Sequence, residues 1–306
     1  MMDIVVFGSI NMDLVTRVDR LPVVGETIIG QSFETVPGGK GANQAVAAAQ
    51  LGASVSMIGR VGDDVFGSHL IQSLRNSAVD CDRIMTTIGT SSGIAAIEVD
   101  IEGNNRIIVV PGANELVGAD NLGHLNDCLS GAKILMLQLE IPIPTVIAAA
   151  ELAAKHGVTV MLDPAPASAD IPEGLLKHIT ILTPNQLEAA QWVGFPINNL
   201  DDAKRAADRL RSHGPDIVVI TMGEQGSLCV AGPDEMIHTP CYPTEVVDTV
   251  AAGDAFNGGL AAALANQQSL RDSLKWATAT ATVAVSRKGA QSAMPTRTEL
   301  HALFTL

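Results

Sequence analysis

Residues 133–164, KILMLQLEIPIPTVIAAAELAAKHGVTVMLDP, contain two short apolar runs separated by an alanine-rich segment. The runs 133–139 and 158–164 are almost continuously apolar, which is typical of strands that are covered on both faces. Residues 142–155 between them have the length and composition of a helix. A strand, a helix and a second strand in this order predict a βαβ unit of a parallel sheet.

The same alternation continues through most of the chain. Further apolar runs predict strands at 3–9, 54–60, 179–184 and 216–223, and a hairpin at 226–238. Helical patterns occupy residues 40–51, 64–76, 119–129, 185–193, 200–213, 253–266 and 270–286. No linker, internal repeat or low-complexity tract divides them. We predict an α/β fold with a doubly wound, mostly parallel sheet flanked by helices, in one domain over residues 1–306.

Two segments depart from this alternation. Residues 13–35 and 92–110 alternate polar and apolar side chains and carry turn residues, among them Pro22, Gly25 and Gly103. This pattern predicts that each contributes to a small antiparallel sheet. We expect the two segments to form a β-lid over the carboxyl edge of the main sheet, where ligands of open α/β sheets bind.

Charge and composition exclude several classes of protein. The 306 residues are 47% hydrophobic and 17% charged, as in a folded globular protein. An excess of 33 acidic over 19 basic residues gives a net charge of −14, which opposes binding to nucleic acid and to anionic membranes. The N-terminus lacks the basic segment of a signal peptide, and no run reaches the roughly 18 apolar residues of a membrane span. We predict a cytoplasmic protein.

Zinc and serine hydrolase chemistry are not indicated either. The cysteines at 81, 128, 229 and 241 are far apart and form no C-x-x-C pair, which favours reduced thiols. The seven histidines show no metal-binding spacing, and a G-x-S-x-G motif is absent.

The glycine-rich stretch PGGKGANQAVAAA, residues 37–49, is the first candidate for ligand binding. It is either a flexible turn or a place where the backbone approaches a ligand closely. Lys40 in the first turn of the following helix opposes the helix dipole, which indicates an anionic partner, and Asn43 lies about one turn further on the same side. The stretch is not a P-loop because Gly41 follows the lysine, and it is not a dinucleotide fingerprint because Gln44 replaces the third glycine.

Polar residues also follow several predicted strands. Asn11 and Asp13 lie two residues apart, so in an extended segment both side chains point to the same face. Such a pair could bind two neighbouring hydroxyl groups of a ligand, or it could only form a turn at the end of the strand. Glu140 ends an apolar strand and points either to solvent or into the cleft. Asn185 and Glu188 share one helical face and either cap the helix or steer a hydrated magnesium ion.

The stretch VDTVAAGDAFNGG, residues 247–259, places Asp254 behind two alanines and a glycine at a helix start. By itself this is a common capping arrangement. It also offers unpaired backbone N–H groups, an anion site, with no bulky side chain in the way. The loop TMGEQG, residues 221–226, is either a hairpin turn or a cover for a nucleotide.

Taken together, these stretches resemble the ribokinase family of carbohydrate kinases. The motifs GSINMD, GGKGANQAVAAA, GDDVFG, LQLEIP, DPAPA, TPNQLE, TMGEQG, VDTVAAGDAFNGG and SRKGAQSAMP follow one another in the family's order. The resemblance implies transfer of the γ-phosphoryl group of ATP to the O5 hydroxyl of ribose, with magnesium as cofactor and potassium as activator. It also implies a homodimer formed through the β-lid.

The resemblance further implies a role for individual residues. The sugar would be bound by Asn11, Asp13, Gly39, Lys40, Gly41, Ala42, Asn43 and Glu140. The nucleotide would be bordered by Asn185, Thr221, Met222, Gly223, Glu224, Gln225, Gly226, Gly253 and Thr278. Glu188, with Asn185, would act on the hydrated magnesium ion. Asp254 would be the general base, beside the backbone of Ala252 and Gly253.

The implied potassium site contains one departure from the family pattern. Its ligands would come from Asp248, Val250, Ala284, Arg287 and Gly289, mostly through backbone carbonyls. At the last ligand position ribokinases often present a serine hydroxyl, whereas this chain has Ala293. Since a methyl group cannot coordinate a cation, a water molecule or Ser292 would have to complete the shell.

Other functions stay open at this point. A deoxyribokinase, another pentose or hexose kinase, or a nucleoside kinase would keep the same chemistry. One tyrosine and two tryptophans offer little for stacking on a base. A non-catalytic sugar sensor with the same fold is the alternative from another class, and the missing fingerprint opposes a dinucleotide-dependent oxidoreductase.

Overall fold

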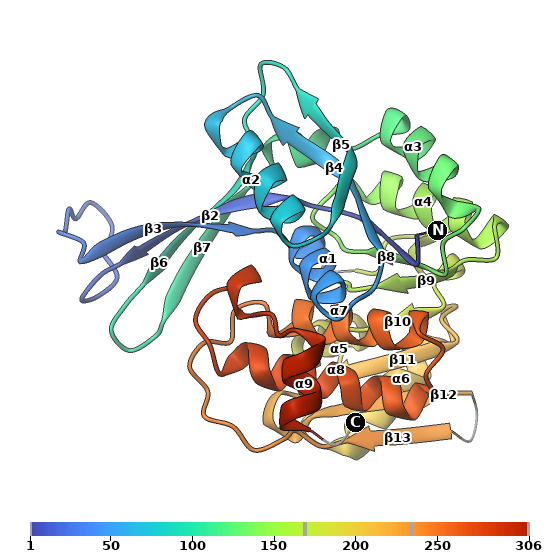
Figure 1. Ribbon diagram of the computed structural model, residues 1–306. Helices are drawn as coiled ribbons and strands as arrows, with labels where there is room; N and C mark the ends of the chain where they lie inside the picture. The colour runs from blue at the N-terminus through green and yellow to red at the C-terminus, as the bar shows by residue number, and fades with distance from the viewer. Residues whose placement is uncertain (1, 168–169, 233–234, 305–306) are drawn as a thin grey trace.

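The computed structural model describes residues 2–167, 170–232 and 235–304, and its centre is a nine-stranded sheet (Figure 1). In spatial order the strands are β13 (Glu235–Thr239), β12 (Ser227–Ala231), β11 (Ile217–Thr221), β10 (Ile181–Leu182), β9 (Thr159–Leu162), β8 (Ile134–Leu137), β1 (Ile4–Phe7), β4 (Val55–Gly62) and β5 (Asp80–Thr87). Pairing is parallel from β5 to β11 and antiparallel at β12 and β13. The predicted α/β class, the mostly parallel sheet and the hairpin are confirmed.

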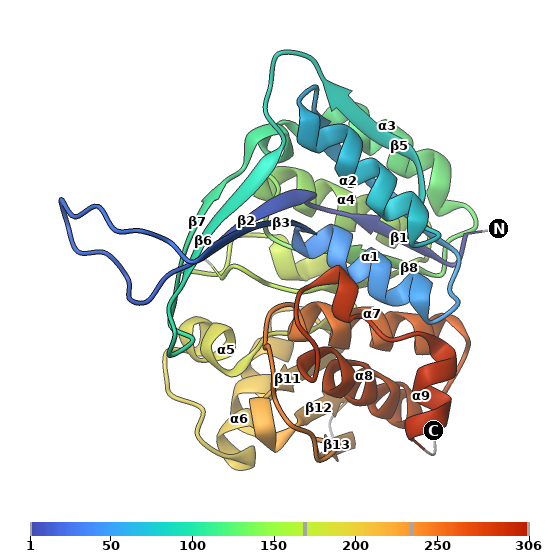
Figure 2. The ribbon, with the colours of Figure 1, turned by 60° about the vertical axis from the view of Figure 1, so that its left-hand side comes forward.

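Helices cover both faces of this sheet (Figure 2). They are α1 (Lys40–Gln50), α2 (Val65–Asn76), α3 (Ala119–Leu129), α4 (Ile143–Lys155), α5 (Gln186–Val193), α6 (Leu200–Arg211), α7 (Ala252–Ala265), α8 (Leu270–Val285) and α9 (Arg297–Leu303). One core joins the sheet to α1, α2, α7, α8 and α9, and the other joins it to α3, α4, α5 and α6. Along β1, Ile4 and Val6 belong to the first core, whereas Val5 and Phe7 belong to the second. A strand buried on both faces therefore needs an apolar residue at every position.

A second, four-stranded sheet projects from the body of the molecule (Figure 1). Its order is β3 (Ser32–Gly38), β2 (Asn11–Arg17), β6 (Gly93–Val99) and β7 (Asn105–Val110). The small sheet is confirmed, but its predicted antiparallel pairing is wrong at the centre, because β2 and β6 are parallel. The two halves of the small sheet come from distant parts of the chain. Strand β2 follows the carboxyl end of β1, and β6 follows the carboxyl end of β5, so both halves leave the large sheet at its carboxyl edge.

Two further elements were not predicted. The edge strand β5 has the sequence DCDRIMTT, in which charged residues interrupt the apolar run. Helix α9 is short and begins at a capping box between Thr296 and Glu299. Both lie at the periphery, where a segment buries fewer residues and its pattern is correspondingly weaker.

The order of the strands determines where the carboxyl ends meet. The chain adds β4 and β5 on one side of β1 and later adds β8, β9, β10 and β11 on the other side. The connections therefore diverge between β1 and β8, which leaves a crevice at their carboxyl ends. Among the described residues, no helix is long and apolar enough to cross a membrane.

Candidate active site

The glycine-rich turn brings the start of α1 against the end of β1. Gly39 has a φ of 87°, a left-handed conformation that suits glycine. A Cβ atom at Gly39 would lie 2.7 Å from the backbone nitrogen of Asn11, and one at Gly41 would lie 2.7 Å from that of Ser9. The close approach that the glycines permit is therefore, in the first place, to the chain's own backbone.

Asp254 lies in the first turn of α7 and is 4% exposed. Both of its carboxylate oxygens accept hydrogen bonds from α1: Oδ2 from Nδ2 of Asn43 at 2.9 Å, and Oδ1 from Nε2 of Gln44 at 3.1 Å. The N-cap of α7 is Ala251, and no side chain caps the helix. The local explanation of Asp254 as a helix cap is therefore wrong, because its side chain faces α1 instead.

Lys40 and several carboxylates form one electrostatic cluster around Asp254. Burial acts against the charge of Lys40, but the negative charges of Asp163, Asp254 and Glu140 outweigh it and raise the pKa of the lysine. Burial raises the pKa of Asp254, although Lys40 and the hydrogen bonds from α1 oppose that rise. Burial, followed by the charges of Glu140 and Asp254, raises the pKa of Asp13 to about 7. The cleft is thus negatively charged, with one cation at its centre.

Glu140 points into this cleft, which decides between its two predicted orientations. Its Oε2 atom accepts a hydrogen bond from Oγ of Ser9 at 2.6 Å and another from the backbone nitrogen of Lys40 at 3.1 Å. The carboxylate thus ties the ends of β1 and β8 to the start of α1.

Asn11 and Asp13 lie on one face of β2, as their spacing predicted. Nδ2 of Asn114 donates to Oδ1 of Asn11 at 2.7 Å. Asn114 is 1% exposed and also exchanges two hydrogen bonds with the backbone of Ile10. Since the Asn11 oxygen is already occupied, its amide nitrogen remains for another partner.

Asn185 and Glu188 form a capping box at the start of α5. Oδ1 of Asn185 accepts from the backbone nitrogens of Leu187 and Glu188, and Oε2 of Glu188 accepts from the nitrogen of Asn185 at 2.8 Å. Burial raises the pKa of Glu188, and the charge of Asp254 adds to the rise. The capping prediction is correct, and the charge of Asp254 acts on Glu188 through space.

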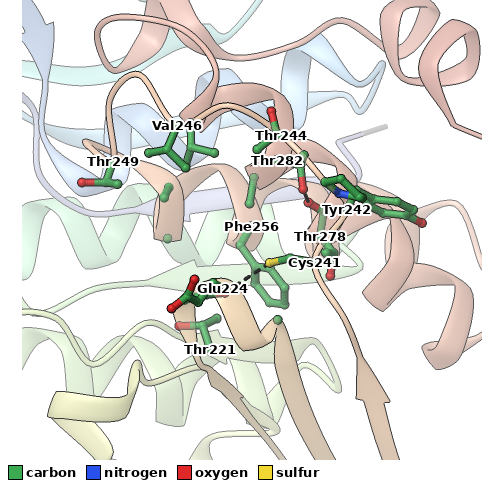
Figure 3. A pocket seen from close by; sticks show the side chains of 17 residues that line it. Thr221, Glu224, Cys241, Tyr242, Thr244, Val246, Thr249, Phe256, Thr278 and Thr282 are labelled. Atoms are coloured by element: carbon green, nitrogen blue, oxygen red, sulfur yellow. Dashed lines mark hydrogen bonds between the residues drawn. The ribbon is translucent and has the colours of Figure 1, made fainter.

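A pocket of about 540 Å³ opens at the start of α7, where Ala252 and Gly253 line it (Figure 3). Thr221, Gly223, Glu224 and Gly226 form one wall, and Thr278 and Thr282 from α8 face them across Phe256. The lining also includes Cys241, Tyr242, Pro243, Thr244, Val246, Thr249, Ala252, Gly253, Ala281 and Val285. Met222, Gln225 and Asn185, which were predicted to border a nucleotide, do not line this pocket, and Met222 is buried in the core.

The segments predicted to bind potassium are joined through Asp248. Its Oδ1 accepts from the backbone nitrogen of Val250 at 3.0 Å, and its Oδ2 accepts from that of Gly289 at 3.1 Å. The carbonyl oxygen of Ala284 accepts from the nitrogen of Arg287 at 3.1 Å. Ala293 is fully buried, and the neighbouring Ser292 donates to the carbonyl of Lys288. Within the described part of the chain, no group of three or more His, Cys, Asp or Glu residues could hold a metal ion.

Comparison with known families identifies this arrangement. A family model described as "pfkB family carbohydrate kinase" matches residues 1–297. The chain belongs to the pfkB family of carbohydrate kinases. The resemblance seen in the sequence motifs is thereby confirmed.

Individual relatives of this carbohydrate kinase match over the whole chain. A ribokinase from Bacillus subtilis is 40% identical over 305 residues, which cover 100% of both chains. A deoxyribokinase from Salmonella typhi is 34% identical over 305 residues, covering 100% of this chain and 99% of the relative. The structure of Arabidopsis thaliana ribokinase complexed with ribose and ATP superimposes with a TM-score of 0.92 at 33% identity, with 100% of each chain covered.

Sequence reasoning on this carbohydrate kinase missed four polar residues around Asp254 and Asn11. Ser9, Gln44, Asn114 and Asp163 are all buried, and each has a hydrogen-bond partner at the site. A signal was available for Asp163, which ends an apolar strand as Glu140 does. Gln44 and Asn114 lie within short local patterns that predict nothing about partners about a hundred or more residues away.

Proposed function

We propose that this kinase transfers the γ-phosphoryl group of ATP to the O5 hydroxyl of D-ribose and releases ribose 5-phosphate. The observation that carries the proposal is the placement of Asp254. Its buried carboxylate lies at the N-terminus of α7, between the polar cleft at β1 and β8 and the pocket of about 540 Å³. Similarity to ribokinases along the whole chain supports the same conclusion.

The polar cleft is the proposed sugar site. Asn11 and Asp13 from β2, Lys40 and Asn43 from α1, and Glu140 after β8 supply donors and acceptors for a polyhydroxylated ligand. The resemblance also assigns Gly39, Gly41 and Ala42 to the sugar site; the two glycines let α1 start close to the backbone of Ser9 and Asn11. Several of these groups are already fixed by neighbours, which lowers the entropy lost when a small ligand is ordered.

The pocket beside α7 is the proposed ATP site. The pocket is lined by Thr221, Gly223, Glu224, Gly226, Gly253 and Thr278, residues that the family resemblance assigns to the nucleotide. In the first turn of α7 the N–H group of Gly253 suits the phosphates at the end of that pocket, whereas the N–H group of Ala252 donates to the carbonyl oxygen of Thr249 at 3.2 Å. The resemblance also assigns Met222, Gln225 and Asn185 to the nucleotide, although they do not line this pocket.

Asp254 is the proposed general base. As the ribose hydroxyl oxygen attacks the γ-phosphorus, the hydroxyl proton passes to the carboxylate, and ADP departs with the electron pair of the broken P–O bond. The N–H group of Gly253 lies in the same turn and would stabilise the charge on the transferred group. The N–H group of Ala252 would contribute by exchanging its hydrogen bond to the carbonyl oxygen of Thr249 for one to the phosphoryl group. Burial raises the pKa of Asp254, and the charge of Lys40 opposes that rise.

The residues present are compatible with the two expected metal ions. Glu188 offers carboxylate oxygens near the negative charge of Asp254, and a magnesium ion would offset that charge. Mg²⁺ bound with ATP would also neutralise part of the phosphate charge. The backbone oxygens near Asp248, Val250, Ala284, Arg287 and Gly289 suit a potassium ion. Ser292 is the only hydroxyl beside Ala293 in its turn that could replace the missing ligand.

We further propose a homodimer through the small sheet and a location in the cytoplasm. All six residues of β7 are exposed, including Ile107, Ile108 and Val109 at 53%, 68% and 47%. An exposed apolar strand of this kind is typical of an interface. The cytoplasm agrees with four cysteines that are free. Sedimentation of the wild type and of Ile108→Glu would test the dimer, which should dissociate in the variant.

A phosphorylation assay tests the proposed activity. ADP release is measured with ribose, 2-deoxyribose, fructose, tagatose and nucleosides, each with and without potassium. Ribose should give the highest kcat/KM. A higher value for 2-deoxyribose would favour the second candidate, a deoxyribokinase, which the 34% identity to such an enzyme supports. No turnover with any sugar would refute the kinase proposal.

A further inference from the structure

Gln44 lies at the centre of a buried chain of hydrogen bonds behind Asp254. It is 1% exposed, although α1 is otherwise rich in alanine. Its Nε2 atom donates one hydrogen bond to Oδ1 of Asp254 at 3.1 Å and another to Oδ2 of Asp163 at 2.9 Å. Its Oε1 atom accepts from Nε2 of Gln138 at 2.6 Å. Four elements distant in the sequence thus meet at one side-chain amide.

We propose that Gln44 is a positioning residue for the phosphoryl transfer, holding the carboxylate of Asp254 in one orientation and favouring its ionised form. This inference rests on the proposed function, in which Asp254 accepts the proton of the sugar hydroxyl. It adds a residue that neither touches the transferred group nor lines the pocket beside α7.

The amide of Gln44 has only one satisfactory orientation. Both of its N–H hydrogens are directed at carboxylate oxygens, and its carbonyl oxygen receives an N–H group. A half-turn of the amide would set its oxygen against the oxygens of Asp163 and Asp254, so two favourable contacts would become unfavourable ones while these carboxyl groups are ionised. The orientation is therefore determined by the network and does not depend on a ligand.

Gln138 and Asp163 in turn have little freedom. Gln138 is fully buried at the end of β8, and a Cβ atom at Gly8 would lie 2.0 Å from its Oε1. That Oε1 atom has no hydrogen-bond partner among the described residues, so the side chain is oriented by its bond to Gln44. Asp163 is 6% exposed at the end of β9. The central strands of the sheet thus provide a rigid support for Gln44.

The same contact affects the charge of the base. Burial raises the pKa of Asp254 and the charge of Glu140 adds to the rise, whereas the charge of Lys40 and the hydrogen bonds from Asn43 and Gln44 lower it again. Burial also raises the pKa of Asp163, the other carboxyl group that Gln44 contacts, to about 8, so Asp163 titrates in the same pH range. A hydrogen bond to a carboxylate favours the ionised form. Loss of the bond should therefore leave more of Asp254 protonated at a given pH, which slows a step that requires the ionised base.

The test compares three variants with the wild type. Gln44→Met keeps the size of the side chain and removes all three hydrogen bonds. Gln44→Glu keeps the shape but adds a third carboxyl group. Gln50→Met is the matched control, because Gln50 is half-buried at the end of α1 and lies six residues beyond Gln44 in that helix. Thermal unfolding, kcat, KM for ribose and for ATP, and kcat/KM from pH 5 to 9 are measured for each.

Gln44→Met should lower kcat about ten-fold at pH 7, with each KM within about two-fold of wild type, since a hydrogen bond to a charged group is removed. The acidic limb of the pH profile should move up by about one pH unit, so raising the pH restores part of the activity. Gln44→Glu should move the limb at least as far, and Gln50→Met should not move it. A purely structural role would reduce activity equally at every pH.

Three results would overturn the inference: wild-type kcat in both Gln44 variants, an unshifted acidic limb, or losses that only follow the fraction of unfolded protein. If Gln44→Met does not fold, the acidic limb of the pH profile of Gln44→Glu is the deciding measurement, and an unshifted limb in that variant would overturn the inference. Wild-type protein and Asp254→Asn are assayed in parallel. Absence of sugar phosphorylation by the wild type would refute the proposed function instead, whereas an active wild type, an inactive Asp254→Asn and an unaffected Gln44→Met would refute only the role of Gln44.

Discussion

The substitution Asp254→Asn removes the proton acceptor while keeping the shape of the side chain. In the wild type both carboxylate oxygens accept hydrogen bonds, from Asn43 and from Gln44. An asparagine can accept only one of them and would set its own NH₂ group against the other donor. The Gln44 amide is held by Asp163, because a half-turn would set its oxygen against that carboxylate. The new asparagine should therefore direct its oxygen to Gln44.

Asn43 can adapt to this change. Its Oδ1 atom has no hydrogen-bond partner among the described residues, so a half-turn of its amide would bring that oxygen to the new NH₂ group. The variant would then satisfy the buried groups and keep the fold. Burial also raises the pKa of Asp254, so the ionised carboxylate is less favourable in the folded state than in the unfolded one. At pH 8 the melting temperature should be equal to or above that of the wild type.

The catalytic loss should nevertheless be large. Removing a general base lowers the rate by about 10²–10⁴-fold, which corresponds to about 3–5.5 kcal/mol of transition-state free energy. A coupled assay of ADP release gives kcat, and calorimetric titration gives the affinity for ribose, which should change little because the other polar groups of the cleft are intact. A kcat within about three-fold of wild type in a folded variant would refute the role of Asp254, because the loss of a general base lowers the rate far more than that.

Further predictions concern the sugar site and the strained start of α7. Lys40→Ala should raise KM for ribose far more than KM for ATP, because the cation lies among the carboxylates of the cleft; equal increases in steady-state assays would show that the sugar site is misplaced. Asp13→Asn should stabilise the free protein at alkaline pH, because the folded state binds the Asp13 proton more tightly, with a pKa of about 7, than the unfolded state does. The free energy of unfolding of the wild type therefore falls as the pH rises from about 4 to about 7, and denaturant titrations should show a gain of at most about 4 kcal/mol at pH 8 that vanishes near pH 4. A pH-independent difference would contradict the shifted pKa. Ala251→Gly should raise the melting temperature by about 1–3 °C, since Ala251 has a φ of 58° and a left-handed alanine costs about 1–2 kcal/mol, of which the flexibility of glycine offsets part. Ala262→Gly, deeper in the same helix, should instead lower it.

The repeating pattern of the chain was sufficient to predict most of the fold. Strands such as β1 and β8 are apolar at every position because helices cover both faces, and that requirement is visible in a single sequence. The edge strand β5 escaped prediction because solvent on one side tolerates its aspartates. The parallel pairing of β2 with β6 could not be read either, since alternation describes a strand but not its neighbour.

At the site, the sequence by itself indicated several of the residues that the structure brings together. Asp254, Asn43, Lys40 and Glu140 stood out because a polar group beside small residues or at a strand end is locally unusual. Only the tertiary structure decided what each one contacts. The carboxylate of Asp254 accepts hydrogen bonds from two side chains of α1 and does not cap its own helix. Gln44 bonds to residues of three other elements. The physical reason is that a hydrogen bond depends on separation in space, and the crevice between β1 and β8 joins segments that are remote along the chain.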